Sequence, residues 1–86
     1  MYYVYILYSE SHKRYYIGQT NDLTNRINRH NSGIEKSTSP YKPWTFIGSL
    51  EKTTRSEAVI LEKKLKNLNS EDLEKFILKH IVGREA

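Results

Sequence analysis

The chain has 86 residues and no cysteine, so we expect one domain without disulfides, thiolate metal sites or a cysteine nucleophile. Hydrophobic residues make up 37% of the chain and charged residues 28%, a balance typical of globular proteins and not of disordered ones. The net charge of +4 favours a polyanionic partner, although many basic proteins bind no nucleic acid.

Aromatic and β-branched residues predict two strands at the start of the chain, over Tyr2–Tyr8 and Arg14–Gly18. The short polar segment between them predicts a turn, so the two strands should form a hairpin. The apolar run in Tyr2–Tyr8 is nearly continuous, which is typical of a strand covered on both faces. We therefore expect this strand at the centre of its sheet.

The next element is predicted to be a helix over Asp22–Asn31. Asn21 is suited to cap its start, Asp22 suits the positive end of the helix dipole, and Gly33 suits its end. The segment Ile34–Pro43 combines Ser, Thr and Pro, a composition that predicts a loop.

A third strand is predicted over Trp44–Glu51, and two helices follow it. Thr54 and Glu57 match a capping box, in which Thr54 caps a helix over Ser56–Leu68 and Glu57 reaches back to the Thr54 amide. The last helix is predicted over Glu71–Ile81, ended by a glycine at position 83.

The element order is therefore ββα-β-αα. It predicts a small α/β domain of the α+β type, in which a three-stranded sheet is flanked by helices on both faces.

Four segments in a fixed order carry a more specific signal: Tyr3-Val4-Tyr5, Tyr16-Ile17-Gly18, Asn21–His30 and Ser56–Lys66. This set resembles the GIY-YIG nuclease family, in particular its small stand-alone bacterial members. The first triplet departs from the family's name, since Tyr3 replaces Gly and Val4 replaces Ile, whereas the second is intact. The resemblance implies a single domain over residues 1–86 with its core over residues 2–81.

The resemblance also implies catalytic roles for five residues. Tyr5 and Tyr16 would lie side by side on adjacent strands and handle the water nucleophile. Arg26 would contact the scissile phosphate, with His30 one turn later on the same helix face. Glu62 would bind a single divalent cation, Mg²⁺ or Mn²⁺.

These residue types suit phosphodiester hydrolysis. The guanidinium of Arg26 offers a planar fork of donors to phosphate oxygens and stays charged. A single carboxylate suits Mg²⁺, which keeps most of its waters and takes phosphate oxygens as further ligands. Tyrosine is a poor base at its usual pKa of ~10. A nearby cation such as Arg26 or the metal would lower that pKa and favour the phenolate.

Each of these residues also has a purely structural explanation. Tyrosines are common in strands, Arg26 and His30 are spaced as a solvated helix face, and Glu62 is spaced to pair with Lys66. The ordered motif set favours the functional interpretation of the two tyrosines, Arg26 and Glu62 together.

We therefore expect a metal-dependent endonuclease that hydrolyses nucleic-acid phosphodiester bonds, with DNA as the expected substrate and selectivity for nicks, flaps or branches. One alternative is a non-catalytic nucleic-acid-binding module that retains the nuclease fold, and another is a protein-interaction domain that uses the last two helices. The sequence leaves open DNA versus RNA, the pathway, the oligomeric state and the identity of the tyrosine base.

Neither a membrane nor an obligate protein partner is expected. No apolar run approaches the ~20 residues of a membrane-spanning helix. Met1–Leu7 lacks the basic region and the small-residue cleavage site of a signal peptide. These features predict a cytoplasmic location.

Overall fold

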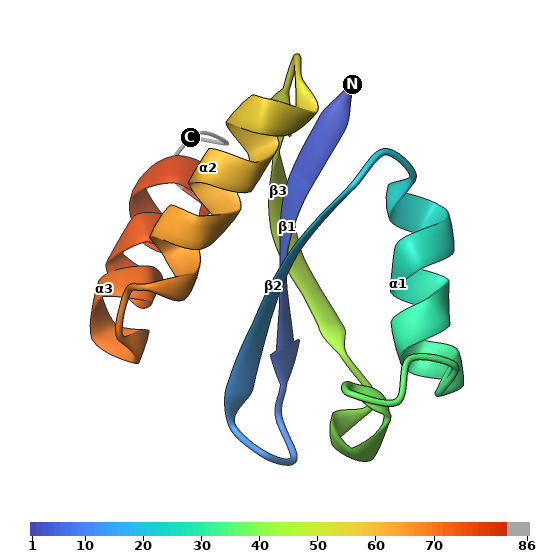
Figure 1. Cartoon of the computed structure of the whole chain (residues 1–86). Coiled ribbons are helices and arrows are strands. Elements are labelled where there is room, and N and C mark those ends of the chain that lie inside the picture. Colours follow the sequence, from blue (N-terminus) through green and yellow to red (C-terminus); the bar gives the residue numbers. More distant parts are fainter. Residues whose placement is uncertain (83–86) are drawn as a thin grey trace.

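The computed structural model describes residues 1–82 and contains one antiparallel sheet (Figure 1). Its strands are β1 (Tyr2–Ser9), β2 (Arg14–Thr20) and β3 (Thr45–Lys52). The strand order is β2-β1-β3, so β1 lies at the centre, as its continuous apolar run predicted. Each strand is within two residues of the predicted bounds.

Three α-helices cover the sheet: α1 (Leu23–Ser32), α2 (Arg55–Lys66) and α3 (Ser70–Ile77). A 3₁₀ turn, η1 (Ser39–Tyr41), lies in the loop after α1, and a π-helical segment, η2 (Leu78–Val82), continues α3. The order β-β-α-β-α-α and the α+β class are thus confirmed. None of the helices within residues 1–82 is long and apolar enough to cross a membrane.

The helices lie on both faces of the sheet, with α1 on one face and α2 and α3 on the other (Figure 1). Side chains alternate along β1, because successive residues of a strand point to opposite faces. Val4 and Ile6 belong to the core cluster beneath α2 and α3, whereas Tyr5 and Leu7 belong to a second cluster with Trp44. Leu23 and Ile27 of α1 pack on this second cluster, so its face is called the α1 face below.

The cap of α1 differs from the prediction. Asp22 is the N-cap, and its carboxylate accepts a hydrogen bond from the Asn25 amide (3.2 Å). The Thr20 hydroxyl accepts from the Asp22 amide (3.1 Å) and holds Asp22 in a non-helical conformation, so the prediction of Asn21 as cap is wrong. Gly33 ends the helix at φ 85°, a left-handed conformation that favours glycine, as predicted.

The predicted capping box of α2 is present with one difference. The Thr54 hydroxyl oxygen accepts from the Glu57 amide (3.2 Å), which confirms Thr54 as the cap. The Glu57 carboxylate accepts from the Thr54 hydroxyl (3.1 Å) and not from the Thr54 amide. Two hydrogen bonds therefore join the pair, one from the Glu57 backbone amide and one between the two side chains.

The last helix is not a single α-helix over Glu71–Ile81. It begins one residue earlier under an Asn69 cap and changes to π-helical hydrogen bonding after Ile77. Ile81 at the end of η2 is buried and packs against Gly48 of β3, where a Cβ atom would lie 2.5 Å from its Cγ2. The wider π turn places Ile81 in the core at this point. The glycine predicted to end this helix, at position 83, lies outside the described residues.

Candidate active site

The two tyrosines lie on the α1 face of the sheet. Tyr5 of β1 and Tyr16 of β2 have ring centroids 6.2 Å apart and ring planes inclined by 35°. They are diagonal neighbours, because Tyr5 pairs with Gly18 and Tyr16 pairs with Leu7 in the strand register. Tyr5 is 1% exposed, whereas Tyr16 is only partly buried. Tyr16 is therefore the more accessible of the two phenols.

Gly18 makes room for the phenol of Tyr5. A Cβ atom at position 18 would lie 2.6 Å from the Tyr5 Cζ and would collide with the Tyr5 hydroxyl. The phenol thus leans from the central strand across the backbone of β2, the edge strand. Any residue larger than glycine at this position requires the ring to move.

His30 connects Tyr5 to the loop after α1. It is 1% exposed, and its Nε2 lies 2.9 Å from the Tyr5 hydroxyl oxygen, while its Nδ1 lies 2.8 Å from Thr38 Oγ1. The Thr38 hydroxyl donates its proton to the carbonyl oxygen of Glu35 (3.3 Å), so toward His30 it can only accept. This network assigns the proton of neutral His30 to Nδ1, and the Tyr5 hydroxyl donates to Nε2.

Burial keeps both members of this pair uncharged. Burial lowers the pKa of His30, and the positive charges of Arg26 and Arg29 lower it further, while Glu35 opposes them. Burial is also the largest cause of the raised pKa of Tyr5, followed by the negative charge that Tyr16 would carry on ionisation. Arg26 lowers the pKa of Tyr5, as expected, but burial outweighs this effect, so Arg26 alone does not favour a phenolate at Tyr5.

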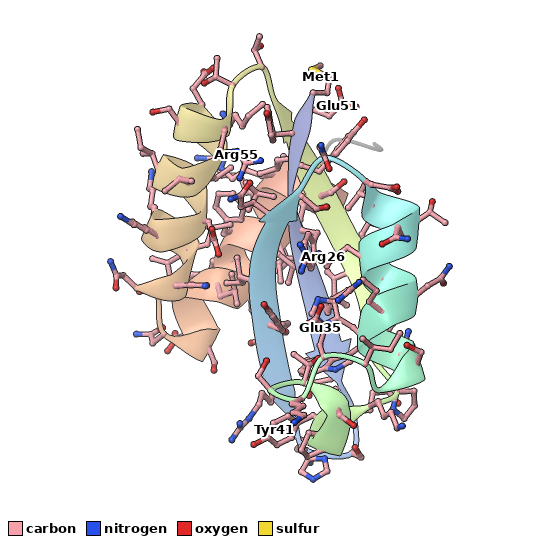
Figure 2. All side chains as sticks on the ribbon, turned by 45° about the vertical axis from the view of Figure 1, so that its right-hand side comes forward. Met1, Arg26, Glu35, Tyr41, Glu51 and Arg55 are labelled. Carbon is pink, nitrogen blue, oxygen red and sulfur yellow. The ribbon has the colours of Figure 1, made fainter. Side chains whose placement is uncertain are left out.

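Two arginines of α1 share the carboxylate of Glu35. Figure 2 shows one of them, Arg26, close to Glu35. Arg29 Nε lies 2.9 Å from Glu35 Oε1, and Arg26 Nη1 lies 3.6 Å from the same oxygen. The Arg29 contact is the main reason that the pKa of Glu35 is lowered. Both arginine side chains remain well exposed, at 40% and 46%, so they can exchange this partner for a phosphate.

Glu62 is positioned by a helix on the other face of the sheet from α1 (Figure 1). It lies on α2, its side chain is 18% exposed, and its carboxylate forms an ion pair with Lys66 at 2.8 Å, the structural pairing that the spacing suggested. α2 packs along β1 and β2, and the charge of Glu62 adds to burial and to Tyr16 in raising the pKa of Tyr5. The pKa of Tyr5 is thus lowered by the charge of Arg26 and raised by the charge of Glu62.

The donor atoms near the tyrosines fit only one kind of metal site. Within residues 1–82 no group of three or more His, Cys, Asp or Glu side chains could enclose a metal ion, which disfavours a site built entirely from protein ligands. A single partly buried carboxylate, Glu62, fits Mg²⁺ or Mn²⁺, since these ions take oxygen ligands and complete their shell with water and phosphate.

Two residues of the site were not identified from the sequence, Glu35 and Thr38. Both lie in the loop after α1, and this loop is held by Trp44, whose Nε1 donates to the Thr38 carbonyl oxygen (3.0 Å). The Asn31 side chain in turn bonds both the amide and the carbonyl of Trp44. A loop of Ser, Thr and Pro gives no periodic signal, so only its tertiary contacts reveal these two residues.

Comparison with known proteins identifies the family and supports the fold. The family model described as the GIY-YIG catalytic domain matches residues 1–79. The solution NMR structure of a UPF0213 protein from Bacillus halodurans is similar, with 29% sequence identity and a TM-score of 0.61. That match covers 93% of this chain and 86% of the other. A search of curated proteins found no match.

Proposed function

The chain belongs to the GIY-YIG catalytic-domain family, and from this premise we propose that it is a metal-dependent endonuclease that hydrolyses phosphodiester bonds of DNA. The observation that carries the proposal is the buried hydrogen-bonded chain from Tyr5 through His30 to Thr38, placed beside Tyr16 and two arginines. A purely structural core gains little from burying three polar side chains in one network, since apolar residues fill such space at lower cost.

Arg26 and Arg29 bind the substrate backbone in this proposal. A phosphate displaces the Glu35 carboxylate and takes over the donors of the two guanidinium groups. The charge of Arg26 acts on the pKa of Tyr5. In this proposal Arg26 holds the scissile phosphate and stabilises the negative charge that develops on the phosphate oxygens.

Tyr16 faces the attacking water. It is the accessible member of the tyrosine pair, whereas Tyr5 is buried. Tyr5 stays protonated and donates its hydroxyl proton to His30 Nε2. The buried pair thus fixes the position of the Tyr16 ring, whose centroid lies 4.7 Å from that of His30.

Glu62 would hold one Mg²⁺ or Mn²⁺ ion, with Lys66 released from its ion pair. When bound, such an ion supplies Lewis-acid stabilisation of phosphate oxygens and of the leaving group. The compartment in which the protein works is the cytoplasm in this proposal, where Mg²⁺ and nucleic acid are both available.

A second candidate function has one observation in its favour. In the free protein Glu62 is already paired with Lys66 and Arg26 with Glu35, so both charged residues have structural partners. A module that binds nucleic acid without cleaving it would keep these pairs.

The experiment that separates the two functions is nicking of supercoiled plasmid DNA by the purified protein in Mg²⁺ or Mn²⁺, with an excess-EDTA control. Tyr16→Phe should abolish nicking, whereas Tyr8→Phe removes a hydroxyl from the opposite face of the sheet and should not. Binding of DNA in EDTA, together with no nicks in Mg²⁺ or Mn²⁺, would favour the non-catalytic module.

A further inference from the structure

A cavity of about 180 Å³ adjoins the tyrosine site. It opens between the β1–β2 hairpin and the loop that carries η1, and six of its lining residues are Arg14, Tyr16, Ser37, Thr38, Tyr41 and Trp44. The cavity shares Tyr16 and Thr38 with the candidate active site. Its volume is smaller than the roughly 300–1,000 Å³ of pockets for drug-sized ligands, so it suits a single small ring system.

The walls of the cavity are aromatic. Trp44 is 5% exposed and stands nearly perpendicular to both Tyr16 (centroids 6.1 Å apart, 78°) and Tyr41 (6.3 Å, 68°). Trp44 is stacked face to face with neither tyrosine. Trp44 therefore forms the floor, and the two partly buried tyrosines form walls that can accept a flat ring.

Arg14 adds a positive charge at the rim. Its guanidinium carbon lies 4.2 Å from the centroid of the Tyr41 ring, a cation–π contact. Arg14 is exposed and has no ion pair with any residue in the described part of the chain. A planar guanidinium of this kind can stack on a nucleobase and can also contact a neighbouring phosphate.

The cavity lies along the path from the phosphate-binding arginines. Figure 2 shows Arg26, Glu35 and Tyr41 in succession down the molecule, with Tyr41 at the end farthest from Arg55. Glu35 links the arginines to the cavity. Its side chain pairs with Arg26, and its backbone carbonyl accepts a hydrogen bond from Thr38 at the cavity wall. A strand with its phosphate on Arg26 would therefore extend toward the cavity.

We propose that this cavity receives one unpaired nucleobase of the substrate strand, next to the scissile phosphate, and that the enzyme's substrates carry single-stranded nucleotides at the cleavage position. The inference rests on the proposed function. A paired base is stacked on both of its faces and cannot enter such a cavity without leaving the duplex, which costs free energy. Strands with frayed, flapped or gapped nucleotides avoid that cost.

The test is a binding experiment in EDTA, with a short single-stranded DNA that carries one fluorescent 2-aminopurine. Stacking in the cavity should quench the fluorescence of this base on binding. The same strand with an abasic site at that position should bind about tenfold more weakly, given the usual strength of base–aromatic stacking. The fully paired duplex should bind without the additional quenching.

Arg14→Met is the main variant, because Arg14 is exposed and its replacement leaves the core intact. It should weaken binding of the intact single strand by about tenfold and leave binding of the abasic strand within about twofold. Arg55→Met is the matched control, since Arg55 also lies over a tyrosine ring, that of Tyr2 at 5.3 Å, far from the cavity. Ser37→Leu fills the cavity from its exposed rim and should reproduce the loss.

An unchanged 2-aminopurine signal on binding would overturn the proposal. Equal effects of Arg14→Met and Arg55→Met would also overturn it, because Arg14 would then act only as one more positive charge. The experiment requires no cleavage, so a protein that nicks DNA can fail it, and a protein that never nicks DNA can pass it.

Discussion

The phenol of Tyr5 occupies the space in which a side chain of its cross-strand partner, Gly18, would lie. The two residues belong to two separate triplets of the sequence motif, and the hairpin places them opposite each other. The position of the Tyr5 ring therefore requires glycine at position 18. The reason is steric, since a Cβ atom there would lie 2.6 Å from Tyr5 Cζ.

Gly18→Ala should displace the Tyr5 ring and break its hydrogen bond to His30. We expect a loss of about 1–3 kcal/mol in the free energy of unfolding, the usual cost of overpacking, together with loss of nicking. Chemical denaturation measures the first and plasmid nicking the second. In a Tyr5→Leu background the same alanine should cost less stability. A cost that is equal in both backgrounds would refute the steric explanation.

Thr38→Val should destabilise the protein, because it removes the acceptor for the His30 Nδ1 proton without changing the side chain's shape. A buried donor left without a partner costs about 1–3 kcal/mol. Thr38→Ser keeps the hydroxyl and should recover most of this loss in urea denaturation. Equal stability of the valine and serine variants would show that the hydroxyl does not bind His30.

The stability of the protein should fall as the solution becomes acidic through the His30 range. Burial lowers the pKa of His30 in the folded state, so the unfolded chain binds a proton first. The stability present above the unfolded-state pKa of about 6.5 is lost as the pH falls toward the lower folded-state pKa.

Denaturation at a series of pH values between about 8 and 5 measures this loss, and His30→Gln should remove part of the pH dependence. His12→Gln changes an exposed histidine and is the matched control. Identical pH profiles for the wild type and His30→Gln would contradict the buried neutral histidine.

Glu35→Gln should strengthen DNA binding and make it more dependent on salt. The change frees Arg26 and Arg29 for phosphates and keeps the Glu35 carbonyl that accepts from Thr38. The slope of the logarithm of the binding constant against the logarithm of the salt concentration should steepen by roughly 0.9 for each additional duplex phosphate neutralised. Glu51→Gln makes the same change of charge at an exposed position away from Arg26 (Figure 2). Equal slopes for the two variants would show that net charge alone governs binding.

Most of the fold was predictable because its signals are local. The apolar run of β1 indicated its central place in the sheet, and the Thr54 cap and Gly33 stop located helix ends. The last helix was predicted less well. The switch from α to π hydrogen bonding depends on the tertiary packing of Ile81 and does not change the spacing of apolar residues in the sequence.

The candidate site was predictable only in part, for a related reason. The motif identified Tyr5, Tyr16, Arg26, His30 and Glu62, but not the loop residues that hold them. Glu35 and Thr38 act through contacts across the chain, and the charge state of Tyr5 depends on burial. A cation beside a tyrosine in the expected site suggested a lowered pKa; Arg26 does lower the pKa of Tyr5, but burial raises it by more.

Metal-dependent nicking by Glu62→Gln, compared with Glu71→Gln, tests the central claim most directly. Each change removes one carboxylate from an i,i+4 ion pair with a lysine, at 2.8 Å for Glu62 and 3.6 Å for Glu71, so each should cost no more than about 0.5 kcal/mol of stability. The account predicts that Glu62→Gln loses Mg²⁺-dependent nicking by at least about 100-fold, the scale of a lost transition-state contact, while Glu71→Gln nicks like the wild type. Nicking by Glu62→Gln at the wild-type rate would contradict it.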